Sequence, residues 1–215
     1  MKGQILYFFD PLCGWCYGFG QTMEDFYHQH KAQHDFEAIA GGMVTNERIA
    51  PYHTMADYIT GVKPQLEQTT GQPISDAYEK NLLHSKILMD SVPPSKALVV
   101  YKKLQAEGSI AFAHALQRMH FSEGKDYNDL GNYVQLAEDF ELDGEEFLAL
   151  MQAEATADAV SQEFAWTQQV GIQGFPTVVI GFDRDFYLLS RGYAPTDVLN
   201  ENMKRALEAH TNKST

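Results

Sequence analysis

The sequence of 215 residues predicts an α/β fold, a mixed β-sheet whose strands are separated in the chain by a long helical segment. Three observations support this prediction. Short β-rich stretches occur only near the two ends of the chain, a helical pattern separates the first pair of strands, and helical periodicity fills the middle. A strand–helix–strand order implies parallel neighbouring strands joined by a right-handed crossover. The order βαβ…ββα therefore allows the outer segments to form one sheet.

The N-terminal βαβ unit is predicted within residues 1–45. Residues 5–9 are continuously apolar, as in a strand that is buried on both faces. Residues 15–30 carry apolar side chains at near-helical spacing, which indicates an amphipathic helix. Residues 36–43 predict a second strand that ends in a glycine pair.

Residues 46–158 are predicted to form an inserted, all-helical domain. Two of its helices have clear starting signals. Ser95 follows two prolines and is placed as the N-cap of a helix that ends at Gly108, and Asp143 lies near the N-cap of a later helix. The repeated helical periodicity between these signals predicts several packed helices and no strand.

The C-terminal part of the sheet domain is predicted within residues 159–215. After the end of a helix, residues 176–181 form a β-branched strand, and residues 186–192 form its hairpin partner. Residues 195–210 then have an apolar face and predict a final helix. Together with the N-terminal unit, these elements complete the mixed sheet.

The charge balance excludes some classes of partner. The chain has 16 Lys plus Arg against 29 Asp plus Glu, a formal net charge of −13. A strongly acidic surface repels phosphate groups, so we expect neither nucleic acid nor a membrane as partner. The apolar run near the N-terminus is too short for a secretory signal, and no run of ~18 apolar residues predicts a membrane span. We therefore expect a cytoplasmic protein.

The two cysteines, Cys13 and Cys16, lie three positions apart and have three interpretations. A structural disulfide is disfavoured, because closing a loop of ~4 residues gives ~2 kcal/mol against ~4.7 kcal/mol for a 100-residue loop. A zinc site needs about four ligands. The nearest histidines, His28, His30 and His34, lie a dozen or more residues away and are expected on the surface. We therefore predict no metal site.

The remaining interpretation is a redox-active dithiol. Cys13 directly follows the first strand and begins the helix, where free backbone N–H groups and the helix dipole favour a thiolate, the attacking species. Cys16 lies one turn further on, in position to resolve a mixed disulfide. Gly14 and Trp15 lie between them, and Trp15 is expected to contact substrate. Asp10 precedes the motif and could perturb the thiols, although an acid at a strand end is usually solvated.

A proline far along the chain supports the dithiol interpretation independently. Pro176 begins the β-branched strand after the helical segment. Its position predicts a cis peptide bond opposite the dithiol, a role that proline fills because it tolerates cis bonds and lacks a backbone donor. The backbone of Phe175 is then expected to pair with an extended substrate peptide.

With these features the sequence resembles the DsbA-like thiol–disulfide oxidoreductases of the thioredoxin superfamily, and most closely their cytoplasmic, FrnE-like branch. The motifs DPLCGWCYGF, AIAGGM and GIQGFPTVVI and the helical insertion carry the resemblance over nearly the whole chain. The resemblance implies a thioredoxin fold, a nucleophile at Cys13, a resolving thiol at Cys16 and a cis-proline at Pro176. It implies thiol- or disulfide-containing proteins or peptides as partners, glutathione as a small redox partner, and no cofactor beyond the dithiol.

Departures from the family pattern leave two questions open. DsbA carries Pro-His between its cysteines, where this chain has Gly14 and Trp15. In the family that the sequence resembles, the intervening pair and the residue before the cis-proline (Phe175 here) tune the reduction potential, so the sequence leaves oxidation, reduction and isomerisation open. One alternative is a glutathione-dependent transferase or isomerase of the kappa or hydroxychromene carboxylate isomerase type, which the presence of Cys16 disfavours. A non-enzymatic, peptide-binding chaperone module is another. The sequence predicts no oligomeric state.

Overall fold

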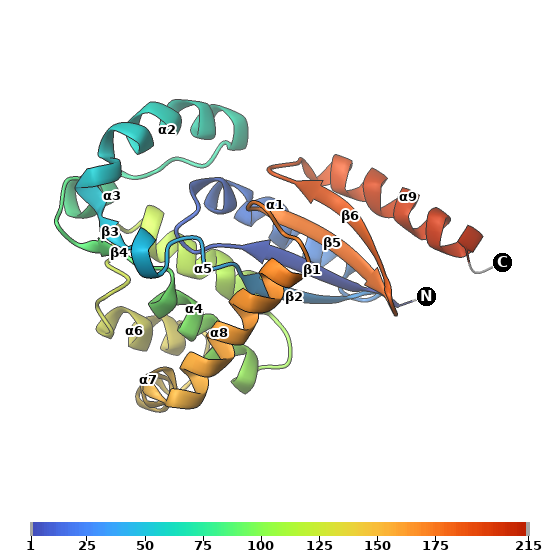
Figure 1. Cartoon of the computed structure of the whole chain (residues 1–215). Coiled ribbons are helices and arrows are strands. Elements are labelled where there is room, and N and C mark those ends of the chain that lie inside the picture. Colours follow the sequence, from blue (N-terminus) through green and yellow to red (C-terminus); the bar gives the residue numbers. More distant parts are fainter. Residues whose placement is uncertain (1, 214–215) are drawn as a thin grey trace.

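A four-stranded mixed sheet lies at the centre of the computed structural model, which describes residues 2–213 (Figure 1). Strand β1 (Gln4–Phe9) pairs in parallel with β2 (Asp35–Ala40). On its other side it pairs antiparallel with β5 (Thr177–Phe182), which pairs antiparallel with the edge strand β6 (Asp185–Arg191). The strand order is β2-β1-β5-β6, so the two ends of the chain build one sheet, as predicted.

Strand β1 is central because its side chains are apolar on both faces. Ile5, Tyr7 and Phe9 belong to the main core on one face of the sheet. Leu6 and Phe8 belong to a smaller core on the opposite face. All five side chains are almost completely buried, which confirms the prediction of a strand covered on both faces.

Helices cover both faces of the sheet. Helix α1 (Gly14–His30) and helix α9 (Thr196–Lys213) pack against each other, and α9 packs against β5 and β6. Helix α8 (Glu154–Gln169) lies across the opposite face and contacts β2, with Trp166 in the smaller core. This arrangement confirms the predicted α/β class and the order βαβ…ββα.

The segment between β2 and α8 is mostly helical and gathers on the side of the molecule opposite α9 (Figure 1). It also contains a ribbon of two short antiparallel strands, so the prediction of an all-helical segment without strands is wrong at these residues. Its elements are η1 (Asn46–Arg48), β3 (Ala50–Pro51), η2 (Tyr52–Met55), α2 (Ala56–Thr70), α3 (Asp76–Tyr78), η3 (Glu79–Leu83), β4 (Leu88–Met89), α4 (Val92–Leu104), α5 (Ser109–Phe121), α6 (Gly131–Asp139) and α7 (Gly144–Gln152). The boundary expected between residues 158 and 159 falls inside α8.

The predicted start of α4 is wrong by one turn. The helix begins at Val92, and Ser91 occupies the N-cap position. Pro93 and Pro94 lie in its first turn, where the missing N–H groups have no intrahelical partner to lose. Ser95 is therefore inside the helix, and its hydroxyl donates to the carbonyl of Ser91 at 2.6 Å.

Other predicted boundaries have mixed outcomes. Strand β2 ends at Ala40, three residues before the predicted Met43. Helix α4 ends at Leu104, and Gly108, with a φ of 87°, takes the N-cap position of α5 instead. Asp143 is confirmed as an N-cap, because its carboxylate accepts the Glu146 backbone N–H at 2.8 Å. None of the helices in residues 2–213 combines the length and apolar character required to span a bilayer.

Candidate active site

Cys13 lies between β1 and α1 and caps the helix. Its backbone is extended, its Sγ accepts the Cys16 backbone N–H at 3.4 Å, and its carbonyl accepts the N–H groups of Cys16 and Tyr17 at 3.0 Å. Both cysteines are free thiols. The Cys13 sulfur therefore lies where helix N–H groups and the helix dipole favour negative charge.

Cys16 has a different environment, since it is completely buried while Cys13 is 7% exposed. The Tyr7 hydroxyl donates to the Cys16 carbonyl at 3.3 Å and lies with it in the main core. Burial raises the pKa of the Cys16 thiol, and the neighbouring Cys13 raises it further. The pair therefore has an outer sulfur at the helix start and a buried inner sulfur that holds its proton more tightly.

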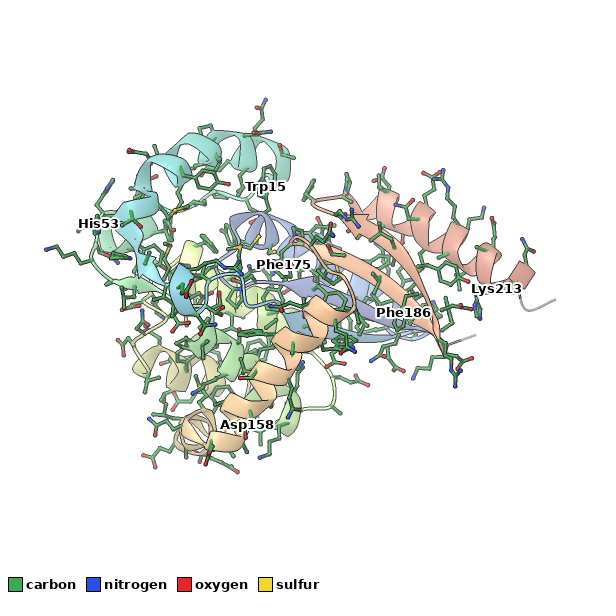
Figure 2. All side chains as sticks on the ribbon, in the orientation of Figure 1. Trp15, His53, Asp158, Phe175, Phe186 and Lys213 are labelled. Carbon is green, nitrogen blue, oxygen red and sulfur yellow. The ribbon has the colours of Figure 1, made fainter. Side chains whose placement is uncertain are left out.

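The loop before β5 closes over the outer sulfur. The Phe175–Pro176 peptide bond is cis, as the sequence predicted. The Cys13 thiol contacts the carbonyl of Phe175, with 3.6 Å between sulfur and oxygen. Figure 2 shows Phe175 and Trp15 close to each other near the middle of the view, although they are far apart in the chain. The structure thus brings together the two motifs that the sequence analysis singled out.

The Phe175 ring packs against the glycine pair that follows β2. A Cβ atom at Gly41 would overlap the ring of Phe175, and one at Gly42 would lie 2.7 Å from the Phe164 ring. Gly42 also has a φ of 68°, which favours glycine. Phe175 therefore points its carbonyl at Cys13 and its ring at Gly41. The sequence showed this glycine pair as a strand ending and as part of the AIAGGM motif, but not its contact with Phe175.

The two residues between the cysteines lie near α2. A Cβ atom at Gly14 would be 3.0 Å from Cδ1 of Leu66 in α2, which leaves little room for a larger residue. Trp15 is half-buried and packs against both the main core and the separate core around α2. Its expected contact with substrate remains a prediction.

Asp10 is completely buried, so its expected solvated position is wrong. Its carboxylate accepts the Leu12 N–H at 2.9 Å, the Met43 N–H at 2.6 Å and the Ser91 hydroxyl at 2.9 Å. Burial raises the pKa of Asp10 to about 6, although these hydrogen bonds oppose the shift. Two of its three partners lie far away in the chain, so no local sequence signal revealed them.

We expect Asp10 to make folding stability depend on pH. Its pKa rises from 3.8 to about 6 on folding, so the folded chain holds this proton more tightly. The resulting stabilisation is fully present below about pH 4 and is lost as the pH rises through about 6, a change of about 3 kcal/mol. Asp10→Asn carries no charge at any pH and removes this dependence. Denaturant unfolding of both chains at about pH 4 and pH 7 measures the difference.

Asp158→Asn is the matched control for this measurement, because Asp158 is exposed on α8 (Figure 2). It should keep the pH dependence of the unchanged chain. If Asp10→Asn also keeps the pH dependence, folding does not raise the pKa of Asp10.

The histidines near α1 are not all on the surface. His34 is only 5% exposed, and its Nδ1 accepts the Gly3 backbone N–H at 3.1 Å, so its predicted surface position is wrong. Within residues 2–213, no three His, Cys, Asp or Glu side chains are placed to hold a metal ion. The hydrogen bond from Gly3 to His34 holds the residues that lead into β1.

The sheet order, two free thiols at the start of α1 and the adjacent cis-proline loop together define a thioredoxin-like fold. The family model described as a DSBA-like thioredoxin domain matches residues 4–204. The chain belongs to this family. A comparison with curated proteins found no significant match.

Solved structures share this fold. A structure from Nitrosomonas europaea, assigned provisionally as a protein disulfide isomerase, is 26% identical with a TM-score of 0.86, covering 98% of this chain and 100% of its own. The cytosolic disulfide reductase DsbM from Pseudomonas aeruginosa is 26% identical with a TM-score of 0.80, covering 96% and 99%. A 2-hydroxychromene-2-carboxylate isomerase, 14% identical with a TM-score of 0.66 and covering 99% and 100%, shares the fold.

Proposed function

We propose that this chain exchanges disulfides with thiol-containing substrates, with Cys13 as nucleophile and Cys16 as resolving thiol. The observation that carries the proposal is the contrast between the two sulfurs. Cys13 lies at the helix start beside the Phe175 carbonyl, whereas Cys16 is buried beneath it. The cis-Pro176 loop lies at the same point and offers its backbone to an extended substrate.

The proposed reaction has two balanced steps. The Cys13 thiolate attacks one sulfur of a substrate disulfide, which forms a mixed disulfide and releases the other sulfur as a thiolate. Cys16 then loses its proton and attacks Cys13 Sγ, which releases the second substrate thiol and leaves a Cys13–Cys16 disulfide. Two electrons pass from the dithiol to the substrate, and the reverse sequence oxidises a dithiol.

The similarity to DsbM supports the reductive direction and a cytosolic location, because DsbM is described as a cytosolic disulfide reductase. A second DsbM structure, described as holding GSH, is 25% identical with a TM-score of 0.78 and covers 94% of this chain and 98% of its own. We infer glutathione as the small thiol that returns the Cys13–Cys16 disulfide to the dithiol. The isomerase neighbour contributes only the fold, so no second function is proposed.

Equilibration with glutathione tests this function. The reduced chain is incubated in buffers of increasing oxidised glutathione, and its free thiols are counted by alkylation and mass spectrometry. We expect Cys13 and Cys16 to be lost together as one intramolecular disulfide, because the second thiol reacts inside the same turn. Thiols that stay reduced, or that carry glutathione on one cysteine without closing a disulfide, would overturn the proposal.

A further inference from the structure

Side chains from the helical segment hold the turn that carries the dithiol. The turn spans residues 10–13 and is closed by the Cys13 N–H, which donates to the Asp10 carbonyl at 3.0 Å. The Ser91 hydroxyl donates to the Asp10 carboxylate, and the Tyr127 hydroxyl donates to the Pro11 carbonyl at 3.3 Å. Both donors come from the segment between β2 and α8, so this segment contacts the turn directly.

Gln117 makes two further contacts with the same turn. It lies on α5, which packs along α1, and its side chain is completely buried. Its Nε2 donates to the Asp10 carbonyl at 3.1 Å and to the Cys13 carbonyl at 3.3 Å. One amide group therefore joins the first and last residues of the turn.

The amide oxygen of Gln117, Oε1, indicates which way round the amide is held. Gln117 Oε1 is buried and has no hydrogen-bond partner among the described residues. An unpartnered buried acceptor is destabilising, so a core position rarely retains one without compensation. Turning the amide over would place Oε1 against two carbonyl oxygens, which is worse. The amide is thus held in the orientation that points its N–H groups at the turn.

We propose that Gln117 is a positioning residue that sets the reactivity of the dithiol from the helical segment. This inference rests on the proposed function. The Cys13 carbonyl belongs to the residue whose sulfur attacks, and the amide brings partial positive charge to it beside the helix start. The amide also fixes the turn, so Cys13 Sγ stays beside the Phe175 carbonyl. The partial positive charge of the amide favours the thiolate and so stabilises the reduced chain.

Gln117→Met tests the proposal, because methionine fills a similar volume without donors. We expect the glutathione equilibrium to shift toward the disulfide by up to about tenfold, equivalent to ~30 mV for two electrons. We also expect the pH midpoint of the thiolate absorbance at about 240 nm to rise in the reduced chain. Removal of the unpartnered Oε1 offsets the lost hydrogen bonds, so the thermal midpoint should change little.

Leu116→Met is the matched control, since Leu116 is the adjacent buried residue on α5 and its side chain makes no polar contact with the turn. It should leave both redox measurements unchanged. If Gln117→Met fails to fold, Gln117→Asn replaces it in the test. The asparagine amide is one methylene shorter and no longer reaches the turn, so we expect a shift in the same direction. Redox values for Gln117→Met or Gln117→Asn that match those of Leu116→Met would overturn this inference alone. A wild-type chain that does not equilibrate with glutathione would overturn the proposed function as well.

Discussion

Cys16→Ser is expected to convert the chain into a trap for mixed disulfides, whereas Cys13→Ser is expected to end exchange. Cys13 is the sulfur at the helix start, in contact with the Phe175 carbonyl. Cys16 is the buried thiol one helical turn away that resolves the mixed disulfide on Cys13. Without Cys16, this mixed disulfide has no neighbouring thiol to release the substrate. Loss of either thiol should lower turnover roughly a thousandfold or more, the scale seen when a catalytic nucleophile is removed.

The two variants are expected to differ in how much mixed disulfide with a substrate peptide they accumulate. Each is mixed with a disulfide-containing peptide, quenched with acid and examined by mass spectrometry without reductant. A peptide adduct should build up on Cys16→Ser and be absent from Cys13→Ser. Equal adducts on both variants would contradict the assignment of attacking and resolving roles.

Gly41→Ala should impair both stability and exchange. The added methyl group would overlap the Phe175 ring, so the ring and the loop ahead of Pro176 must move. Overpacking of this kind costs about 1–3 kcal/mol. Because the same loop presents the Phe175 carbonyl to Cys13, exchange with a model disulfide should slow roughly tenfold or more. Thermal unfolding and stopped-flow exchange measure the two effects.

Two comparisons isolate the ring overlap as the cause. Gly61→Ala lies inside α2 with open space around its added methyl, and should stabilise the chain by about 0.5–1 kcal/mol with unchanged exchange. Adding Phe175→Leu to Gly41→Ala makes room for the methyl group and should restore part of the stability. If Gly41→Ala has wild-type stability and exchange rate, the contact between Gly41 and Phe175 does not position the loop.

Much of the fold was predictable because its signals are local. The apolar run of β1, the β-branched run of β5 and the Asp143 cap each follow from a few neighbouring residues. Ser95 shows the limit of such rules. A serine after two prolines resembles a cap, yet prolines are compatible with the first helical turn, and packing placed the true start at Val92.

The candidate site was predictable only in part, for the same reason. The cysteine motif and the cis-proline stand out in the sequence, and the structure brings them together. Asp10 and Gln117 do not stand out, because their roles depend on partners that folding supplies. The Asp10 carboxylate bonds Met43 and Ser91, which lie 33 and 81 positions away. A single carboxylate or amide carries no sign of such a partner.

The separation between the two halves of the site has a consequence for synthesis. Cys13 and Phe175 are 162 positions apart, so a ribosome completes the dithiol long before the loop that covers it. At about 5–20 residues per second this interval lasts roughly 10 to 30 s. Throughout that time the nascent chain carries two thiols without the Phe175 carbonyl. The length of the helical segment therefore sets how long an unfinished chain can cross-link to a wrong partner.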